Sequence, residues 1–166
     1  FLLNQCTPPL GYVTNNDDLC PNESGIYNGC ANEQINWITS KSYNTAGGLT
    51  SSAKVYYDDL GKPIQSQSVD VRTGTTWASS TLYDVQGRAA LQTLSAPVDN
   101  VVADFHYQPD FIKNGSGQTY TSTDFDTDIE NPSTIGNQEG TLGWYYDEVN
   151  SNEPYQDVTD YPFSRT

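Results

Sequence analysis

The sequence is poor in basic residues: seven Lys and Arg stand against 21 Asp and Glu, so the formal net charge is −14. Proteins that bind nucleic acid carry a basic surface that neutralises phosphates, and this composition does not supply one. Binding to anionic lipid surfaces is not expected either, because it also requires a basic surface. The sequence also lacks any run of about 20 apolar residues of the kind that spans a bilayer. We therefore expect no nucleic-acid partner and no membrane insertion.

Methionine is absent, and residue 1 is Phe. We therefore expect a processed product or a fragment of a longer polypeptide. Cysteine is scarce, and its three copies all lie in the first 30 residues: Cys6, Cys20 and Cys30. In an oxidising compartment one disulfide can form among them, with one thiol left over and the pairing open. A zinc site is not expected, because there is no fourth Cys and the only histidine, His106, is distant in the sequence.

Long helices are not expected either. The chain contains 13 Gly and 9 Pro, only 35% of its residues are hydrophobic, and no stretch keeps apolar residues at the i, i+3, i+4, i+7 spacing. Much of the apolar content is carried by 12 Tyr, whose ring can be buried while its hydroxyl reaches water. This composition predicts an all-β fold whose sheet is packed on one face and wet on the other.

A short turn unit, Tyr-[Asp/Asn]-x-x-Gly, occurs three times. It lies in "VYYDDLGKPIQSQSV" (55–69), in "TLYDVQGRAALQTL" (81–94) and, with Asn for Asp, in "SYNTAGGLTSS" (42–52). The Asx side chain accepts a backbone N–H two residues on, and Gly provides a positive φ that closes the turn. The predicted turn residues are Tyr43, Asn44, Gly47, Tyr57, Asp58, Gly61, Tyr83, Asp84 and Gly87. An internal repeat predicts an antiparallel meander, with the three tyrosines packed as a ladder along one face.

The chain divides into three parts by composition. Residues 1–34 are an irregular, Cys-containing leader, and residues 35–96 are the repeat meander. Residues 97–166 form a less regular β segment, with an acidic, polar loop at 114–140 that we expect to be a surface excursion. Within this last part, "NVVADFHY" (100–107) and "GWYYDEV" (143–149) are predicted to be strands.

No catalytic residues are predicted. His106 is near Asp104 and Asp110 in the sequence, but no serine has the G-x-S-x-G setting of an activated nucleophile, so a strand histidine is the better interpretation. Nor is a cofactor expected.

Two groups of side chains are candidates for binding. Alternate acidic residues would share one face of a strand and could bind Ca²⁺: Asp124, Asp126, Asp128 and Glu130. An EF-hand loop fails here, because Ile129 and Ile135 stand where Gly and Glu are required, so a solvated loop without metal is favoured. The aromatic run Trp144, Tyr145 and Tyr146 beside Asp147 is a candidate glycan contact, with core packing as the favoured alternative.

The repeat resembles a known family. Tyr57-Asp58 with Gly61-Lys62, and Tyr83-Asp84 with Gly87-Arg88, are similar to the YD repeat of bacterial Rhs (rearrangement hot spot) proteins. Residues 81–97 and 142–166 also resemble long Rhs-repeat surface proteins of the kind exported by type IX secretion systems. The repeat covers about residues 40–95, and the wider similarity about 35–166.

The resemblance implies a sheet ribbon that spirals into a hollow, secreted or cell-surface shell around a C-terminal toxin. The paired Asp-Pro-x-Gly motifs of shell self-cleavage do not occur here; "QPDF" and "NEPY" do not match. The expected function is thus one structural arc of the shell, without catalysis. Its partners would be the remainder of a longer Rhs polypeptide and, as a further candidate, secretion-system components. The alternative is a cell-surface adhesin or carbohydrate-binding β-domain.

Overall fold

The computed structural model describes residues 35–98, 105–128, 130–151 and 158–165. The chain divides into two compact units, Phe1–Ile35 and Asn36–Thr166, and the second contains all the elements described below. The three cysteines and the predicted disulfide lie outside the described residues.

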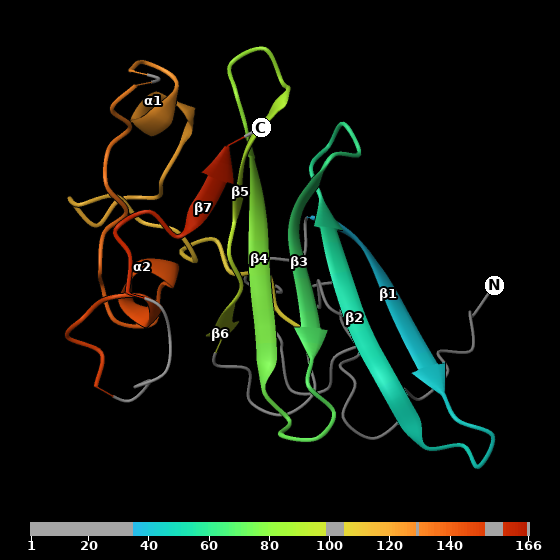
Figure 1. Ribbon diagram of the computed structural model, residues 1–166. Helices are drawn as coiled ribbons and strands as arrows, with labels where there is room; N and C mark the ends of the chain where they lie inside the picture. The colour runs from blue at the N-terminus through green and yellow to red at the C-terminus, as the bar shows by residue number, and fades with distance from the viewer. Residues whose placement is uncertain (1–34, 99–104, 129, 152–157, 166) are drawn as a thin grey trace, which may run out of the picture. The chain divides into compact units, whose positions relative to one another are not determined.

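The second unit is built on a seven-stranded antiparallel sheet (Figure 1). Its strands are β1 (Asn36–Tyr43), β2 (Leu49–Tyr57), β3 (Pro63–Val69), β4 (Thr76–Tyr83), β5 (Ala89–Thr93), β6 (Ala96–Val98) and β7 (Phe163–Arg165). The strand order is β1-β2-β3-β4-β5-β7, and β6 pairs with β4. The predicted all-β antiparallel meander is confirmed for β1 to β5, in which each strand pairs with the next along the chain.

The turns between these strands follow the predicted chemistry. Gly47, Gly61 and Gly87 have φ angles of 82°, 77° and 78°, which a glycine adopts without strain. Each of these glycines donates its N–H to the carbonyl of the Asx residue three positions earlier. The strand register shifts by one residue at the tyrosine that precedes each turn, as a β-bulge does.

The three repeat tyrosines do not form a ladder, and that prediction is wrong. Tyr57 and Tyr83 are 26 residues apart, which is two strands and two turns, so both lie at the same end of the sheet. Tyr43 and Tyr57 are only 14 residues apart, which is one strand and one turn, so they lie at opposite ends (Figure 1). Tyr43 is accordingly 60% exposed. The structural repeat is therefore a two-stranded unit, and the Asn44 turn is out of phase with it.

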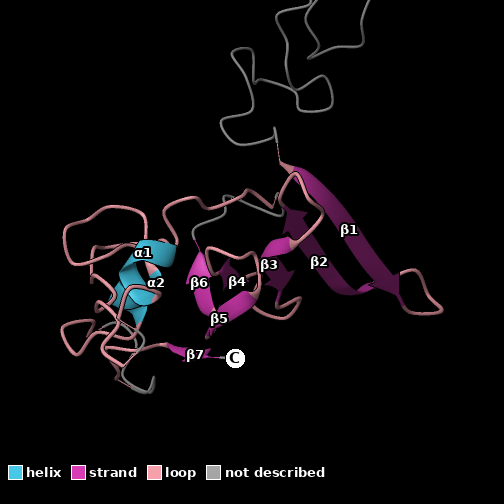
Figure 2. Cartoon of the chain, turned by 90° about the horizontal axis from the view of Figure 1, so that it is seen from above, coloured by secondary structure: helices cyan, strands magenta, loops and turns pink. Residues whose placement is uncertain are grey.

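The chain after the meander packs against one face of the sheet. Two short helices, α1 (Ser122–Phe125) and α2 (Leu142–Tyr145), lie with their connecting loops beside β4 to β6 and away from β1 (Figure 2). The predicted strand at 143–149 is wrong, because Thr141 accepts the N–H of Trp144 and caps α2. Residues 105–107 are also not a strand, while 100–104 lie outside the described residues. None of the helices in the described ranges has the length and apolarity to cross a membrane.

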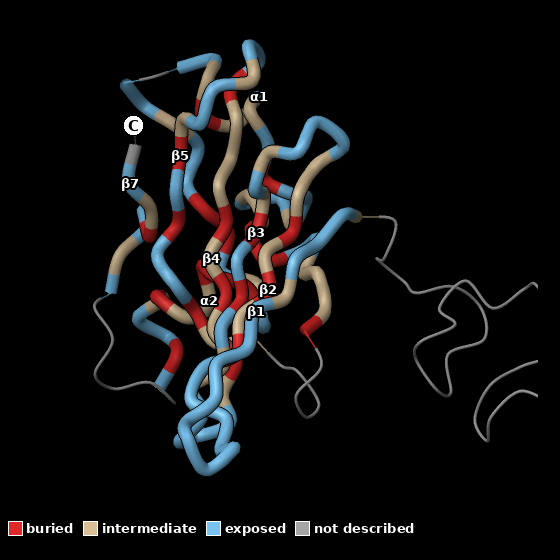
Figure 3. Tube along the Cα trace, turned by 90° about the vertical axis from the view of Figure 1, so that its right-hand side faces the viewer, coloured by how far each residue is buried: buried red, intermediate tan, exposed pale blue. Residues whose placement is uncertain are grey.

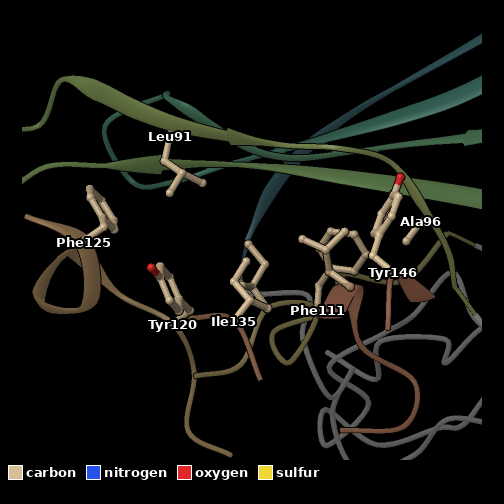
Figure 4. Close-up of a cluster of buried hydrophobic side chains, with 10 residues drawn as sticks. Leu91, Ala96, Phe111, Tyr120, Phe125, Ile135 and Tyr146 are labelled. Carbon is tan, nitrogen blue, oxygen red and sulfur yellow. The ribbon is translucent and has the colours of Figure 1, made fainter. Parts of the chain in front are cut away.

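The core lies between the sheet and this chain segment (Figure 4). Its members are Ala78, Leu91, Ala96, Phe111, Ile112, Tyr120, Phe125, Ile135, Leu142 and Tyr146. Three of these, Tyr120, Phe125 and Ile135, belong to the loop predicted as a surface excursion, so that prediction is wrong for its apolar residues. Polar residues surround each of them in the sequence, and no helical or strand periodicity marks them as buried.

The chemical type of the residues buried on the packed face differs between the two sides of the sheet. Buried and more exposed residues alternate along β2, β3 and β4, as in a sheet with one covered face (Figure 3). The buried positions on β4 to β6 include Ala78, Leu91 and Ala96 of the hydrophobic core, whereas those on β2 and β3 are mostly polar: Ser52, Lys54, Gln65 and Gln67. This polar part of the packed face needs hydrogen-bond partners, because a buried polar group without one is costly.

Candidate functional site

The Asp84 turn is held by a network centred on one carboxylate. Asp84 Oδ1 accepts the N–H groups of Gln86 (3.0 Å) and Arg88 (2.8 Å), and Oδ2 accepts Nε of Arg88 at 2.6 Å. The backbone N–H of Arg88, and then its guanidinium, hold the pKa of Asp84 below its ordinary value, although burial opposes them. This carboxylate is engaged in structure and is not poised for chemistry.

The Asp58 turn is joined to the Asp84 turn. Asp58 Oδ1 accepts the N–H groups of Leu60 (3.0 Å) and Lys62 (2.7 Å). The ammonium of Lys62 then crosses to the neighbouring turn, where it donates to the Gly87 carbonyl at 2.8 Å and lies 5.1 Å from the centre of the Tyr83 ring. These contacts link the two Tyr-Asp turns to each other.

Tyr83 completes this link. Its hydroxyl donates to the carbonyl of Pro63 at 2.9 Å. Burial, and then the charge of Asp58, raise the pKa of the Tyr83 hydroxyl, so it keeps its proton to more alkaline pH than an ordinary tyrosine. We call these contacts among Lys62, Pro63, Tyr83 and Gly87 the inter-repeat staple. Its residues lie where the Asp58 turn meets the Asp84 turn.

A fourth turn of the same kind was not predicted. In "NGSGQ" (114–118), Asn114 Oδ1 accepts the N–H groups of Ser116 (3.0 Å) and Gln118 (3.1 Å), and Gly117 has a φ of 78°. No Tyr precedes Asn114, so a search for the Tyr-Asx unit passes over it. The shared signal is Asx-x-x-Gly alone, and that shorter pattern would have found it.

The polar part of the packed face binds main chain. Lys54 Nζ donates to the Phe105 carbonyl (3.3 Å), and Gln67 Nε2 donates to the His106 carbonyl (2.6 Å). Gln65 exchanges two hydrogen bonds with the main chain of Gln108, at 3.0 and 2.9 Å. Side chains of two strands thus fix the 105–108 segment across the sheet. The sequence did not predict this, because the partners are about 40 to 50 residues apart.

The aromatic candidates for glycan contact are used in packing to different degrees. Tyr146 is buried, and its hydroxyl donates to the Ser95 carbonyl at 2.7 Å. Tyr145 packs edge-on against Trp77, with ring centres 5.8 Å apart, and is half-buried like Trp144. Glycan contact by Trp144 and Tyr145 stays a prediction, whereas Tyr146 is a core residue.

The acidic residues at 124–130 do not lie on a strand, so the shared face considered for calcium binding is not formed. Asp124 lies in α1, where Oδ2 accepts the N–H of Thr121 (2.7 Å) and Oδ1 accepts Nδ2 of Asn114 (3.1 Å). Asp128 accepts the N–H groups of Glu130 and Asn131 in a turn. Within the described ranges, no three His, Cys, Asp or Glu residues are grouped as metal ligands.

The described surface includes the following two hollows. The first, of about 170 Å³, lies between β3–β4 and the 107–112 segment, and its wall includes Gln65, Tyr83 and Tyr107. Burial raises the pKa of the Tyr107 hydroxyl. The second is broad and open, about 490 Å³, and is lined by Glu130, Asn131, Pro132, Tyr161 and Phe163. The lining of this second hollow thus combines two aromatic rings with a carboxylate and an amide.

Comparisons with known proteins identify no relative: no family model, no curated protein and no solved structure matches this chain.

Replacing Asp84 with Asn is expected to flatten the acid dependence of stability. The folded-state pKa of Asp84 lies below its unfolded value, so its contribution is present above about pH 4 and is lost as the pH falls through the folded pKa. Asn keeps the turn, because Asn44 accepts the same two N–H groups, but it does not titrate. Unfolding midpoints measured between neutral and strongly acid pH would check this. Equal acid sensitivity of the variant and the parent would contradict it.

Proposed function

We propose that residues 36–165 are one arc of a larger, secreted β-sheet shell of the Rhs type, without catalysis of its own. The observation that supports this most is the combination of linked YD turns with an open sheet edge. The inter-repeat staple joins one two-stranded unit to the next at the same end of the sheet, which is how a ribbon of repeats would grow.

The open edge is β1. Among the described residues β1 pairs with β2 alone, and seven of its eight residues are exposed. Large apolar side chains are exposed on and beside it: Trp37 (48%), Ile38 (58%), Tyr43 (60%) and Leu49 (39%). Native proteins usually shield such an edge, because its free N–H and C=O groups recruit other strands. In a shell, the preceding turn of the ribbon would cover it.

The second candidate is a carbohydrate-binding β-domain on a cell surface. It is favoured by the open hollow lined by Glu130, Asn131, Tyr161 and Phe163. The 46% exposure of Tyr161 leaves ring surface for a sugar. An autonomous domain of this kind would need no further strand on β1, and the state of that edge therefore separates the two candidates.

The test compares this chain alone with the full-length gene product. Amide hydrogen exchange should be fast in β1 and slow in β3 and β4 of the isolated chain, and β1 should become protected in the full-length protein. Ile38→Lys should change the unfolding free energy of the isolated chain by no more than about 0.5 kcal/mol, yet destabilise the full-length protein. Leu60→Lys is the matched control, since Leu60 is 79% exposed in a turn.

Sedimentation, together with hydrogen exchange, would reveal the result that contradicts the shell. A monodisperse monomer whose β1 amides are as protected alone as in the full-length protein would contradict the shell and favour the adhesin. The exchange experiment is done on the dilute monomer, because at higher concentration the exposed apolar edge strand is expected to pair with its own copies.

A further inference from the structure

The Asn114 turn contains a chemical feature that the other Asx turns of the described residues lack. Asn114 is followed by Gly115, whereas Asn44, in a turn with the same hydrogen bonds, is followed by Thr45. The nitrogen of Gly115 carries no neighbouring Cβ that would shield it, and Gly115 is exposed. We propose that Asn114-Gly115 is a self-modification site, at which Asn114 loses its side-chain amide to become aspartate or isoaspartate.

The chemistry needs only the chain and water. The backbone nitrogen of Gly115 attacks Cγ of Asn114 and forms a new N–C bond, which closes a five-membered succinimide ring. The Cγ–Nδ2 bond breaks, and the proton lost by the Gly115 nitrogen leaves with Nδ2 as ammonia. Water then opens either carbonyl of the ring, so the product is aspartate or isoaspartate, with no change in oxidation state.

The turn places groups around the reacting amide. The N–H groups of Ser116 and Gln118 both donate to Oδ1, at 3.0 and 3.1 Å, so they face the oxygen on which negative charge develops during the attack. The Asp124 carboxylate accepts a hydrogen bond from Nδ2 at 3.1 Å and fixes the orientation of the amide. Asp124 is a positioning residue here, because it does not form or break a bond to carbon.

The modification would alter the fold locally. The aspartate product has no side-chain N–H to donate to Asp124, and it places a second carboxylate beside the Asp124 carboxylate. Isoaspartate also lengthens the main chain by one carbon, at a residue whose backbone bridges to Ile135 and whose neighbour Lys113 bridges to Thr119. The segment that brings Tyr120, Phe125 and Ile135 to the core would therefore loosen. Modification of Asn114 would therefore change the local structure slowly and irreversibly.

The experiment incubates the folded chain at mildly alkaline pH and follows it by peptide mapping with mass spectrometry. The peptide with Asn114 should gain about 1 Da, as aspartate or isoaspartate replaces asparagine, while the peptide with Asn44 stays unchanged. Gly115→Ala should slow the reaction at least about tenfold, since the added methyl hinders the attacking nitrogen. This variant should fold, because a Cβ at Gly115 meets no atom within 4 Å and its φ is not in the left-handed range.

Further measurements keep the role of the turn separate from that of the Asn-Gly pair. Asp124→Asn removes the carboxylate, and a slower reaction in the folded variant but not in urea would support the positioning role. Hydrogen exchange should rise at residues 119–125 in the modified fraction alone. The proposal is overturned if Asn114 keeps its mass in the folded chain while changing in urea, or if Asn44 reacts as fast.

Discussion

Replacing Phe111 with alanine is expected to lower the free energy of unfolding by about 3–5 kcal/mol, the usual cost of removing a buried aromatic ring. Phe111 is 2% exposed and lies in the core between the sheet and the chain that covers it. Its carbonyl also accepts the N–H of Leu142, so it connects the start of α2 to this layer. Loss of its ring would leave a cavity where these parts meet.

Denaturant unfolding of the parent and the variant would measure this effect. Leu60→Ala is the control, because Leu60 is 79% exposed and a surface change of this kind stays within about 0.5 kcal/mol. A loss below about 1 kcal/mol for Phe111→Ala would show that residues 105–151 contribute little to stability. The sheet would then depend on a partner for its cover, as a bare shell segment would.

The parts of the fold that were predicted correctly are those encoded locally. An Asx residue and a Gly three positions later specify a turn through contacts within five residues, and apolar or β-branched residues on each side specify strands. The meander from β1 to β5 is a series of such units, and the sequence alone was sufficient for it. The ladder prediction failed because it counted tyrosines without counting strands: 14 residues reverse the chain once, and 26 reverse it twice.

The covering layer could not be predicted, because its contacts are not local. Tyr120 and Ile135 are buried by residues far away in the sequence, and nothing in "TDFDTDIE" indicates that Phe125 faces a core. In the sequence, Gln65 and Gln67 are typical of the solvent-facing positions of a polar strand. They are buried because the main chain of 106–108 supplies their hydrogen bonds, and that pairing is visible only in three dimensions.

The difference between local and long-range contacts also bears on the proposed function. The inter-repeat staple supports the ribbon interpretation with contacts that the YD motif alone does not contain: Lys62 reaches the Gly87 carbonyl, and the Tyr83 hydroxyl reaches the Pro63 carbonyl. Lys62 follows the glycine of its turn, where the next repeat has Arg88. Arg88 instead returns to Asp84 of its own turn. The basic residue at this position therefore joins two turns in one case and closes its own turn in the other.

Replacing Gly87 with valine is expected to destabilise the chain more than replacing Gly61 with valine. Both glycines have φ near +78°, where a β-branched residue is strained by about 1–2 kcal/mol. A Cβ at Gly61 meets no atom within 4 Å, whereas a Cβ at Gly87 meets the ammonium of Lys62. Gly87→Val therefore adds the loss of the Lys62 hydrogen bond to the strain, about a further 1 kcal/mol.

Thermal and denaturant unfolding of both valine variants, each in the parent and in a Lys62→Met background, would separate the two effects. With Met at position 62 the ammonium is gone, so the costs of Gly87→Val and Gly61→Val should converge, and the coupling energy of the cycle would measure the staple. The reverse order, or a coupling energy of zero, would contradict a link between the repeats through Lys62. In that case the two YD units would stand side by side without stabilising each other, and a ribbon that grows by adding such units would lose its main structural support.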